Sequence, residues 1–235
     1  MIVAITTPAA LVAKAATSTI PVVFEIAGDP IELGLAASLS RPGGNLTGVT
    51  QLGVEVQAKH LELLHEVLPT ANVIGALLNP ANALAKSTTN QLEMAARALS
   101  LELHILHASS DREFDAVFET AVKLHVQGLV IGVDPLFASR RAELAALALR
   151  HGLPTIGSFR EFVDAGGLMS YSGNLNDAYR LAGIFAGKVL KGARPADLPI
   201  QQSAAVELLI NLKTAKRLGL TVPPALLARA DDVIE

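Results

Sequence analysis

The stretch from Ile20 to Thr50, IPVVFEIAGDPIELGLAASLSRPGGNLTGVT, sets the fold expected for this chain. An apolar run over 21–26 ends at a Gly-Asp-Pro break, and a helical pattern over 32–39 leads through Arg-Pro-Gly-Gly-Asn to a second apolar run. The stretch therefore predicts strand, loop, helix, turn and strand. This order is typical of a parallel sheet whose strands are joined by crossover helices.

Asp29, in the Gly-Asp-Pro break, is the first candidate ligand-binding residue. In an open parallel sheet, ligands bind where strands end and helices begin, so a polar residue at this place can contact a small molecule. Gly-Asp-Pro is also an ordinary turn signal, in which the aspartate caps the following helix. The sequence leaves both interpretations open.

The rest of the chain continues the alternation of apolar strands and helical patterns. Strands are expected at 1–5, 73–78, 102–106, 129–133, 155–158, 168–171 and 206–211. Helices are expected at 9–16, about 51–68, 83–99, 110–125, 139–151, 160–164, 176–190 and 212–218. We expect an α/β fold with parallel sheets and right-handed crossovers. The pattern alone does not separate two sheets from one large sheet.

The composition indicates a well-buried globular protein without a nucleic-acid partner. At 235 residues, the chain can form two compact lobes or one large α/β domain. Hydrophobic residues make up 51% and charged residues 17%, which argues against a disordered chain. Cysteine is absent, so disulfides and cysteine-based catalysis or metal sites are excluded. The net charge of −3 without a basic run argues against nucleic-acid binding.

An enzymatic function finds little support in the sequence. It lacks a Gly-x-Ser-x-Gly elbow, a phosphate-binding loop and a dinucleotide fingerprint. His60 and His65 do not have zinc-binding spacing and are expected at the surface or flank of a helix. We expect no catalytic residue, no metal and no cofactor. An enzyme on this scaffold would need the strand-end carboxylates to come close together with shifted pKa values.

Thr6 and Thr7 precede Pro8 at the expected start of a helix and are candidate ligand-binding residues. The hydroxyls and free amides of a helix N-terminus can hold a carboxylate, because the amides point outward and the helix dipole favours an anion. A threonine before proline is also a simple helix cap. Capping alone and capping with ligand contact are equally compatible with the sequence.

Asn79 and Asp134 are two further candidates, because each follows an expected strand. The Asn79 amide can hydrogen-bond an amino-acid ligand, and the Asp134 carboxylate, like that of Asp29, can face a ligand ammonium. Each is followed by proline, and Asn-Pro and Asp-Pro are equally signals of a turn or a helix start.

Several long blocks resemble, in order, those of a family of ABC-transporter substrate-binding proteins that includes tryptophan- and tyrosine-type members. The blocks are TPAALVAKAATSTIPVVF, GDPIELGLAASLSRPGGNLTGVT, NPAN at 79–82, DPLFASRRAELAALALRHGLPTI from Asp134, EFVDAGGLMSYS from Glu161 and the final LINLKTAKRLGLTVPPALLARADDVIE. The similarity covers nearly the whole chain and rests on long blocks rather than one short pattern.

The resemblance implies a type I periplasmic-binding fold with two Rossmann-like lobes. Lobe 1 would comprise 1–53 and 170–197, and lobe 2 would comprise 54–169 and 198–235. Tyr171 would lie near the cleft between the lobes, where its ring can stack on a ligand and its hydroxyl can hydrogen-bond. Tyr171 is therefore the sixth candidate ligand-binding residue.

The resemblance also implies the substrate-binding component of an ABC importer, which closes around a small polar or zwitterionic ligand by a hinge motion. The implied ligand is an amino acid, with aromatic ones included, and the implied partner of the exported protein is an ABC permease. Such proteins are periplasmic or extracytoplasmic. The apolar start at Met1 lacks the basic region of a signal peptide, so a genuine start there would predict a cytoplasmic protein. No stretch reaches the roughly 18 apolar residues of a membrane span.

Relative to the family, the chain is expected to lack about two βα units before Met1, on the order of 60 residues. The first lobe would then be truncated at its N-terminus. A parallel sheet without neighbouring strands leaves backbone groups unpaired, which favours pairing with another chain and predicts a homodimer. The alternative is a truncated non-transport relic or sensory module that mainly dimerises, and an enzyme is a more distant one.

Overall fold

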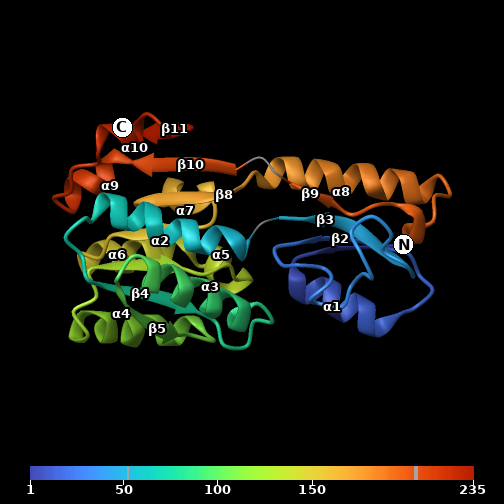
Figure 1. The fold of residues 1–235 in the computed structure, drawn as a ribbon, viewed down its shortest axis with the longest axis horizontal. Coiled ribbons are helices and arrows are strands. Elements are labelled where there is room, and N and C mark those ends of the chain that lie inside the picture. The colour runs from blue at the N-terminus through green and yellow to red at the C-terminus, as the bar shows by residue number, and fades with distance from the viewer. Residues whose placement is uncertain (52, 204–205) are drawn as a thin grey trace. The chain divides into compact units, whose positions relative to one another are not determined.

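The protein forms two compact units, each built from two separate stretches of the chain. Figure 1 shows the computed structural model, which describes residues 1–51, 53–203 and 206–235. Unit 1 comprises Met1–Gly53 and Gly173–Ala205, and unit 2 comprises Val54–Ser172 and Val206–Glu235. None of the helices in the described part of the chain combines the length and apolar character that a membrane crossing requires.

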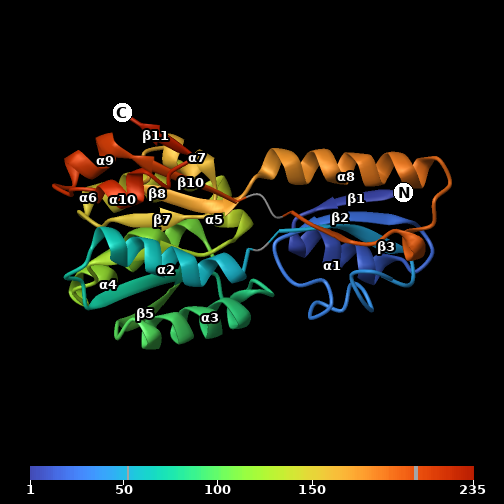
Figure 2. The ribbon, with the colours of Figure 1, turned by 45° about the horizontal axis from the view of Figure 1, so that its top comes forward.

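Unit 1 contains a four-stranded sheet in the order β1-β2-β3-β9, in which each strand pairs in parallel with its neighbour. The strands are β1 (Ile2–Ile5), β2 (Val22–Ile26), β3 (Leu46–Thr50) and β9 (Gln201–Gln202). Helices α1 (Thr7–Ala16) and α8 (Leu175–Leu190) cover opposite faces of this sheet, as Figure 2 shows. The short helix η2 (Pro195–Asp197) precedes β9. All five residues of β2 are buried because the strand is central and covered on both faces.

Residues 32–39 of unit 1 do not form the helix that the sequence predicts. The chain makes one turn after Asp29, in which the Leu33 amide donates to the Asp29 carbonyl at 3.0 Å. Gly34 then adopts a φ of 66°, and the Leu35 amide donates back to the Pro30 carbonyl at 2.7 Å. A residue in this left-handed conformation ends a helix, so the apolar spacing after it cannot extend the turn.

Unit 2 contains a seven-stranded sheet in the order β11-β10-β8-β7-β6-β4-β5. The strands are β4 (Val73–Leu78), β5 (Glu102–His107), β6 (Gly128–Ile131), β7 (Thr155–Gly157), β8 (Met169–Gly173), β10 (Val206–Asn211) and β11 (Asp232–Ile234). Parallel pairing joins β5 to β4, β4 to β6, β6 to β7, β7 to β8 and β10 to β11. The expected α/β class with parallel sheets is therefore confirmed.

Two hydrophobic clusters lie on the two faces of the unit 2 sheet. One cluster is formed with α2 (Glu55–Val67), α3 (Ala85–Ala98), α9 (Leu212–Arg217) and α10 (Pro224–Leu227). The other is formed with α4 (Phe114–Lys123), α5 (Pro135–Ser139), α6 (Arg141–Arg150) and α7 (Arg160–Asp164). The short helix η1 (Asp111–Glu113) precedes α4, and the Glu113 carboxylate accepts from the Ser109 amide at 2.7 Å.

The chain passes between the units slightly later than the family resemblance implies. The expected passages lie after 169 and after 197, whereas the contacts divide the chain after Ser172 and after Ala205. Strand β9 explains the second difference, because it pairs with β3 and so belongs to unit 1. The sequence gives no signal for β9 or for β11, since both strands are short and neither is fully buried.

Gly48 in β3 provides a test of the packing at the centre of unit 1. A Cβ atom at this position would lie 2.0 Å from the carbonyl oxygen of Phe24 in β2. Gly48→Ala should therefore lower the free energy of unfolding by roughly 2–4 kcal/mol, measured by urea denaturation followed by circular dichroism.

The matched control is Gly183→Ala on the exposed side of α8, where a Cβ atom meets nothing within 4 Å. This substitution should leave the free energy of unfolding unchanged or raise it by up to about 1 kcal/mol, because alanine favours a helix over glycine. Equal denaturation midpoints for the Gly48→Ala variant and the wild type would contradict the tight approach of β2 and β3.

Candidate ligand-binding site

The junction between β1 and α1 places Thr6 and Thr7 at the carboxyl edge of the unit 1 sheet. Thr6 is the N-cap of α1, and its hydroxyl oxygen accepts from the Ala9 amide at 3.5 Å. Its φ of 103° and ψ of 150° fall in a region that non-glycine residues rarely adopt, at a cost of about 1–3 kcal/mol. The Thr7 hydroxyl oxygen is buried and accepts from the Ala27 amide at 3.3 Å. Both threonines therefore serve the local structure, and the helix N-terminus that they form is of the type that holds anions.

Asp29 lies in the loop after β2, as the sequence predicts. Its Oδ1 atom accepts from the Ile31 amide at 2.7 Å, which closes a turn over Pro30. A hydrogen bond joins the loop to β3, because the Thr50 hydroxyl donates to the Gly28 carbonyl at 2.7 Å. Asp29 remains half-buried at this edge of the sheet. The turn interpretation of Gly-Asp-Pro therefore accounts for the hydrogen bond of Oδ1, one of the two carboxylate oxygens of Asp29.

Glu25 and Gln51, which the sequence analysis did not select, lie at the same edge of unit 1. Glu25 is 4% exposed and Gln51 is 5% exposed, and the Gln51 side-chain amide donates a short hydrogen bond to Glu25 Oε1. Burial raises the pKa of Glu25, and the hydrogen bond from Gln51 opposes that rise. The only sequence signal was a glutamate inside an otherwise apolar strand.

Asn79 and Asp134 come together in unit 2, because they follow the neighbouring strands β4 and β6. Asn82 connects the two loops, since its side-chain amide donates to Asp134 Oδ2 at 2.7 Å. Asp134 Oδ1 accepts from the Leu136 amide at 2.8 Å, and Asn79 Oδ1 accepts from the Ala81 amide at 3.0 Å. The void beside these groups measures about 10 Å³, which is room for about one water molecule. Both oxygens of Asp134 are therefore already bonded within unit 2.

Tyr171 lies on β8, two strands away from β6, and contacts a buried histidine that was expected at the surface or flank of a helix. His60 on α2 is fully buried, and its Nε2 atom lies 2.5 Å from the Tyr171 carbonyl oxygen. The two rings meet edge to face with centroids 6.4 Å apart. Within the described residues, His60 Nδ1 has no hydrogen-bond partner. Burial lowers the pKa of His60 to about 4, so the ring is neutral at pH 7 and donates through Nε2.

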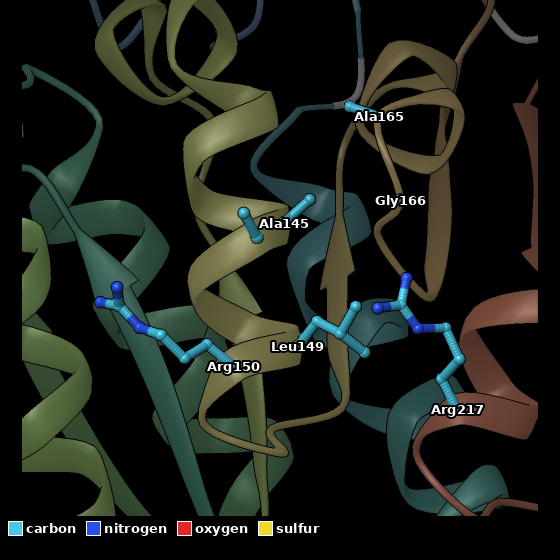
Figure 3. Close-up of a pocket in the computed structure, with 7 residues that line it drawn as sticks. Ala145, Leu149, Arg150, Ala165, Gly166 and Arg217 are labelled. Atoms are coloured by element: carbon cyan, nitrogen blue, oxygen red, sulfur yellow. The ribbon is translucent and has the colours of Figure 1, made fainter.

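A surface pocket of about 450 Å³ lies in unit 2 at the opposite ends of the strands. Gly166 precedes β8 and Arg150 precedes β7, so the pocket borders the amino ends of these strands. Figure 3 shows Arg150 and Arg217 on opposite sides of Leu149, and the Arg150 guanidinium is paired with the Asp115 carboxylate. The pocket is lined by Ala145, Ala146, Leu149, Arg150, Ala165, Gly166 and Arg217. It contains none of the residues predicted from the sequence.

The structure thus brings five of the six candidates together in two groups, one in each unit, and Tyr171 lies apart from both groups on β8. Thr6, Thr7 and Asp29 share the carboxyl edge of unit 1, whereas Asn79 and Asp134 share a corner of unit 2. Within the described ranges, no three histidine, aspartate or glutamate side chains gather as a metal-binding group. The chemistry available at these edges is hydrogen bonding and charge pairing with a small polar molecule.

Comparison with known proteins places this architecture in a family. A family model described as ABC transporter substrate binding protein matches residues 1–234. The chain belongs to this family. Its resemblance to tryptophan- and tyrosine-type members and its type I periplasmic-binding fold are therefore confirmed.

Three relatives illustrate the match. A tyrosine-binding protein of Clostridioides difficile (strain R20291) is 30% identical over 222 residues, which cover 94% of this chain and 63% of that protein. An ABC domain from Streptococcus pneumoniae, solved in complex with L-Trp, has a TM-score of 0.89 at 30% identity. The match covers 100% of this chain and 80% of that one. A conserved domain protein from Vibrio cholerae has a TM-score of 0.90 at 29% identity, over 98% of this chain and 77% of that one. This chain therefore spans less than two thirds of the curated relative.

The buried His60 predicts a pH-dependent stability. The histidine takes up a proton near pH 6.5 when unfolded and near pH 4 when folded, so protonation favours the unfolded state. The contribution of neutral His60 to the free energy of unfolding is fully present above about pH 6.5 and is lost as the pH falls towards 4. His60→Gln should remove up to roughly 3 kcal/mol of the fall in unfolding free energy between pH 7 and pH 4.

The measurement is a series of urea denaturation curves between pH 4 and pH 7. His107→Gln, which removes an exposed histidine, should keep the pH dependence of the wild type. A His60→Gln curve that runs parallel to the wild-type curve over this pH range would show that His60 is not buried in its neutral form.

Proposed function

We propose that this chain is the substrate-binding component of an ABC importer and that its ligand is an amino acid, with aromatic amino acids the first to test. The observation that carries this proposal is the family match over residues 1–234. Two relatives support the ligand class, since one is a tyrosine-binding protein and the other was solved with L-Trp. The family consists of binding proteins, and catalysis forms no part of the proposal.

The N-terminus of α1 supports a ligand with a carboxylate. Helix α1 spans ten residues and begins after Thr6, at the carboxyl end of β1, and the amides of Ala9 and Ala10 are bonded to Thr6. Pro8 has no amide to offer, so the Thr7 amide and the Thr6 hydroxyl are the groups that we propose contact the carboxylate. The strained backbone of Thr6 is consistent with such a role, because strain of this kind is concentrated at ligand-binding positions.

The remaining candidates stay predictions of ligand contact. Asn79 and Tyr171 can hydrogen-bond a ligand through the side-chain amide and the phenol hydroxyl. Asp29 and Asp134 each accept a hydrogen bond from the turn that follows them, which reduces their capacity to face an ammonium. A ligand position in a cleft between the lobes also stays a prediction of the family resemblance.

The proposed partners follow from the same family membership. An importer component delivers its ligand to an ABC permease, and we propose an extracytoplasmic place of action on this ground alone. The homodimer expected from the sequence stays a prediction, and native mass spectrometry of the purified protein would test it.

Isothermal titration calorimetry with L-tryptophan and L-tyrosine tests the proposed function. At least one of the two should bind, and a concentration of 100 times the Kd should stabilise the folded protein by about 2.7 kcal/mol, seen as a higher melting temperature. Tryptamine and tyramine, which lack the carboxylate, should bind at least about tenfold more weakly because they lose the contact with the α1 N-terminus.

The outcome that would contradict the proposal is a protein that binds neither of these amino acids nor any other in a mixture of the twenty. Equal affinity for tryptophan and tryptamine would keep amino-acid binding but remove the carboxylate contact at Thr6 and Thr7.

A further inference from the structure

Unit 1 contains a buried side-chain carboxylate, that of Glu25, which has no role in the proposed contact between the ligand carboxylate and α1. Glu25 lies in the central strand β2, four residues before Asp29, and is 4% exposed. A strand that is covered on both faces normally carries apolar residues throughout. A carboxylate at such a position is unfavourable unless a partner compensates its charge.

The described residues provide Glu25 with a hydrogen bond but not with a cation. Gln51 donates to Oε1, and no described lysine, arginine or histidine forms an ion pair with the carboxylate. Arg180, on the helix α8 that covers this face, is paired with Asp177 at 2.7 Å. Glu25 therefore differs from an acid in a structural ion pair, and one of its oxygens remains available to another donor.

The position of Glu25 connects it to the proposed carboxylate contact. The Thr6 amide donates to the backbone carbonyl of Glu25 at 2.9 Å, so the loop before α1 rests on this residue. Alternate residues of a strand share a face, which puts the Glu25 side chain on the side of Val23 and α8. Val23 packs among apolar residues, whereas Glu25 is two positions nearer the carboxyl edge, where ligands of parallel sheets bind.

We propose that Glu25 pairs with the ammonium group of the ligand and so selects zwitterionic amino acids over their deaminated analogues. The inference rests on the proposed function and makes it more specific, because it assigns the ammonium to a residue of unit 1, the unit that also carries the proposed carboxylate contact. Gln51 holds the carboxylate in place through Oε1, which leaves Oε2 for the ammonium.

The electrostatics of the empty and occupied site follow from this arrangement. Burial raises the pKa of Glu25, so the charged form is disfavoured until a cation arrives. An ammonium at hydrogen-bond distance restores a compensated pair in a poorly solvated place, where such a bond is stronger than in water. An analogue without the ammonium leaves the Glu25 carboxylate without this compensation, which is the basis of the selectivity.

Calorimetric titration of the full chain with matched pairs of ligands tests the proposal. The pairs are L-tryptophan with indole-3-propionate and L-tyrosine with 3-(4-hydroxyphenyl)propionate, in which each second compound lacks the ammonium. Glu25→Gln should weaken binding of the amino acid by about 10- to 100-fold and leave binding of the deaminated analogue unchanged. Glu25→Asp, which keeps the charge, should retain more of the discrimination than Glu25→Gln.

The control variant is Glu32→Gln, which removes an exposed carboxylate of the same unit and should keep the wild-type affinities. Without ligand, Glu25→Gln should melt no lower than the wild type, because it removes a buried charge that no cation compensates. These two measurements separate a loss of the ammonium contact from a loss of structure.

Two results would overturn the role of Glu25 while the proposed function stands. One is equal affinity of Glu25→Gln and the wild type for the amino acid, and the other is an equal loss for the amino acid and its analogue. A wild type that binds neither amino acid refutes the proposed function, and the role of Glu25 with it.

Discussion

The structure depends on one constraint, which is that the chain leaves the parallel strands β1, β2, β4 and β6 at one edge of their sheets. The strand interiors are apolar because helices cover both faces, so polar side chains collect where the strands end. The helices that follow begin with amides that have no partner within the helix. Residues such as Thr6 and Asp134 satisfy these amides, and the same donors and acceptors are what a small polar ligand needs.

The same polar groups can cap a helix or bind a ligand, and this explains why acidic residues near strand ends differ in the hydrogen-bond acceptors that they leave for a ligand. Asp29 and Asp134 have short side chains beside the turn that they cap, so their oxygens meet nearby amides. Glu25 lies within a strand, where the backbone amides already belong to the sheet, and among the described residues its side chain accepts from the amide of Gln51 alone. A carboxylate inside a strand therefore keeps hydrogen-bond acceptor capacity, whereas a carboxylate at a helix start has already used that capacity on nearby amides.

Most strands and helices could be predicted from the sequence, because long apolar runs and helical spacing dictate them, as for β4, β10 and α7. The helix expected at 32–39 was wrong because Gly34 takes a left-handed conformation that apolar spacing does not reveal. His60 was misplaced because α2 is buried over a wider face than its leucine stripe indicates. Glu25 escaped notice because its partner is 26 positions further along the chain, and only the pairing of β2 with β3 brings them together.

The division of unit 1 between residues 1–53 and 173–205 has a consequence for synthesis on the ribosome. When β1, β2 and β3 have emerged, Val23 and Val49 still lack the helix α8 that covers them, and β3 lacks its neighbour β9. Almost 120 residues of unit 2 must be translated before that cover arrives. Domains fold as their chain becomes available, and most strands of unit 2 are synthesised before α8 and β9 complete unit 1. The nascent unit 1 sheet is therefore the part that a chaperone would have to shield.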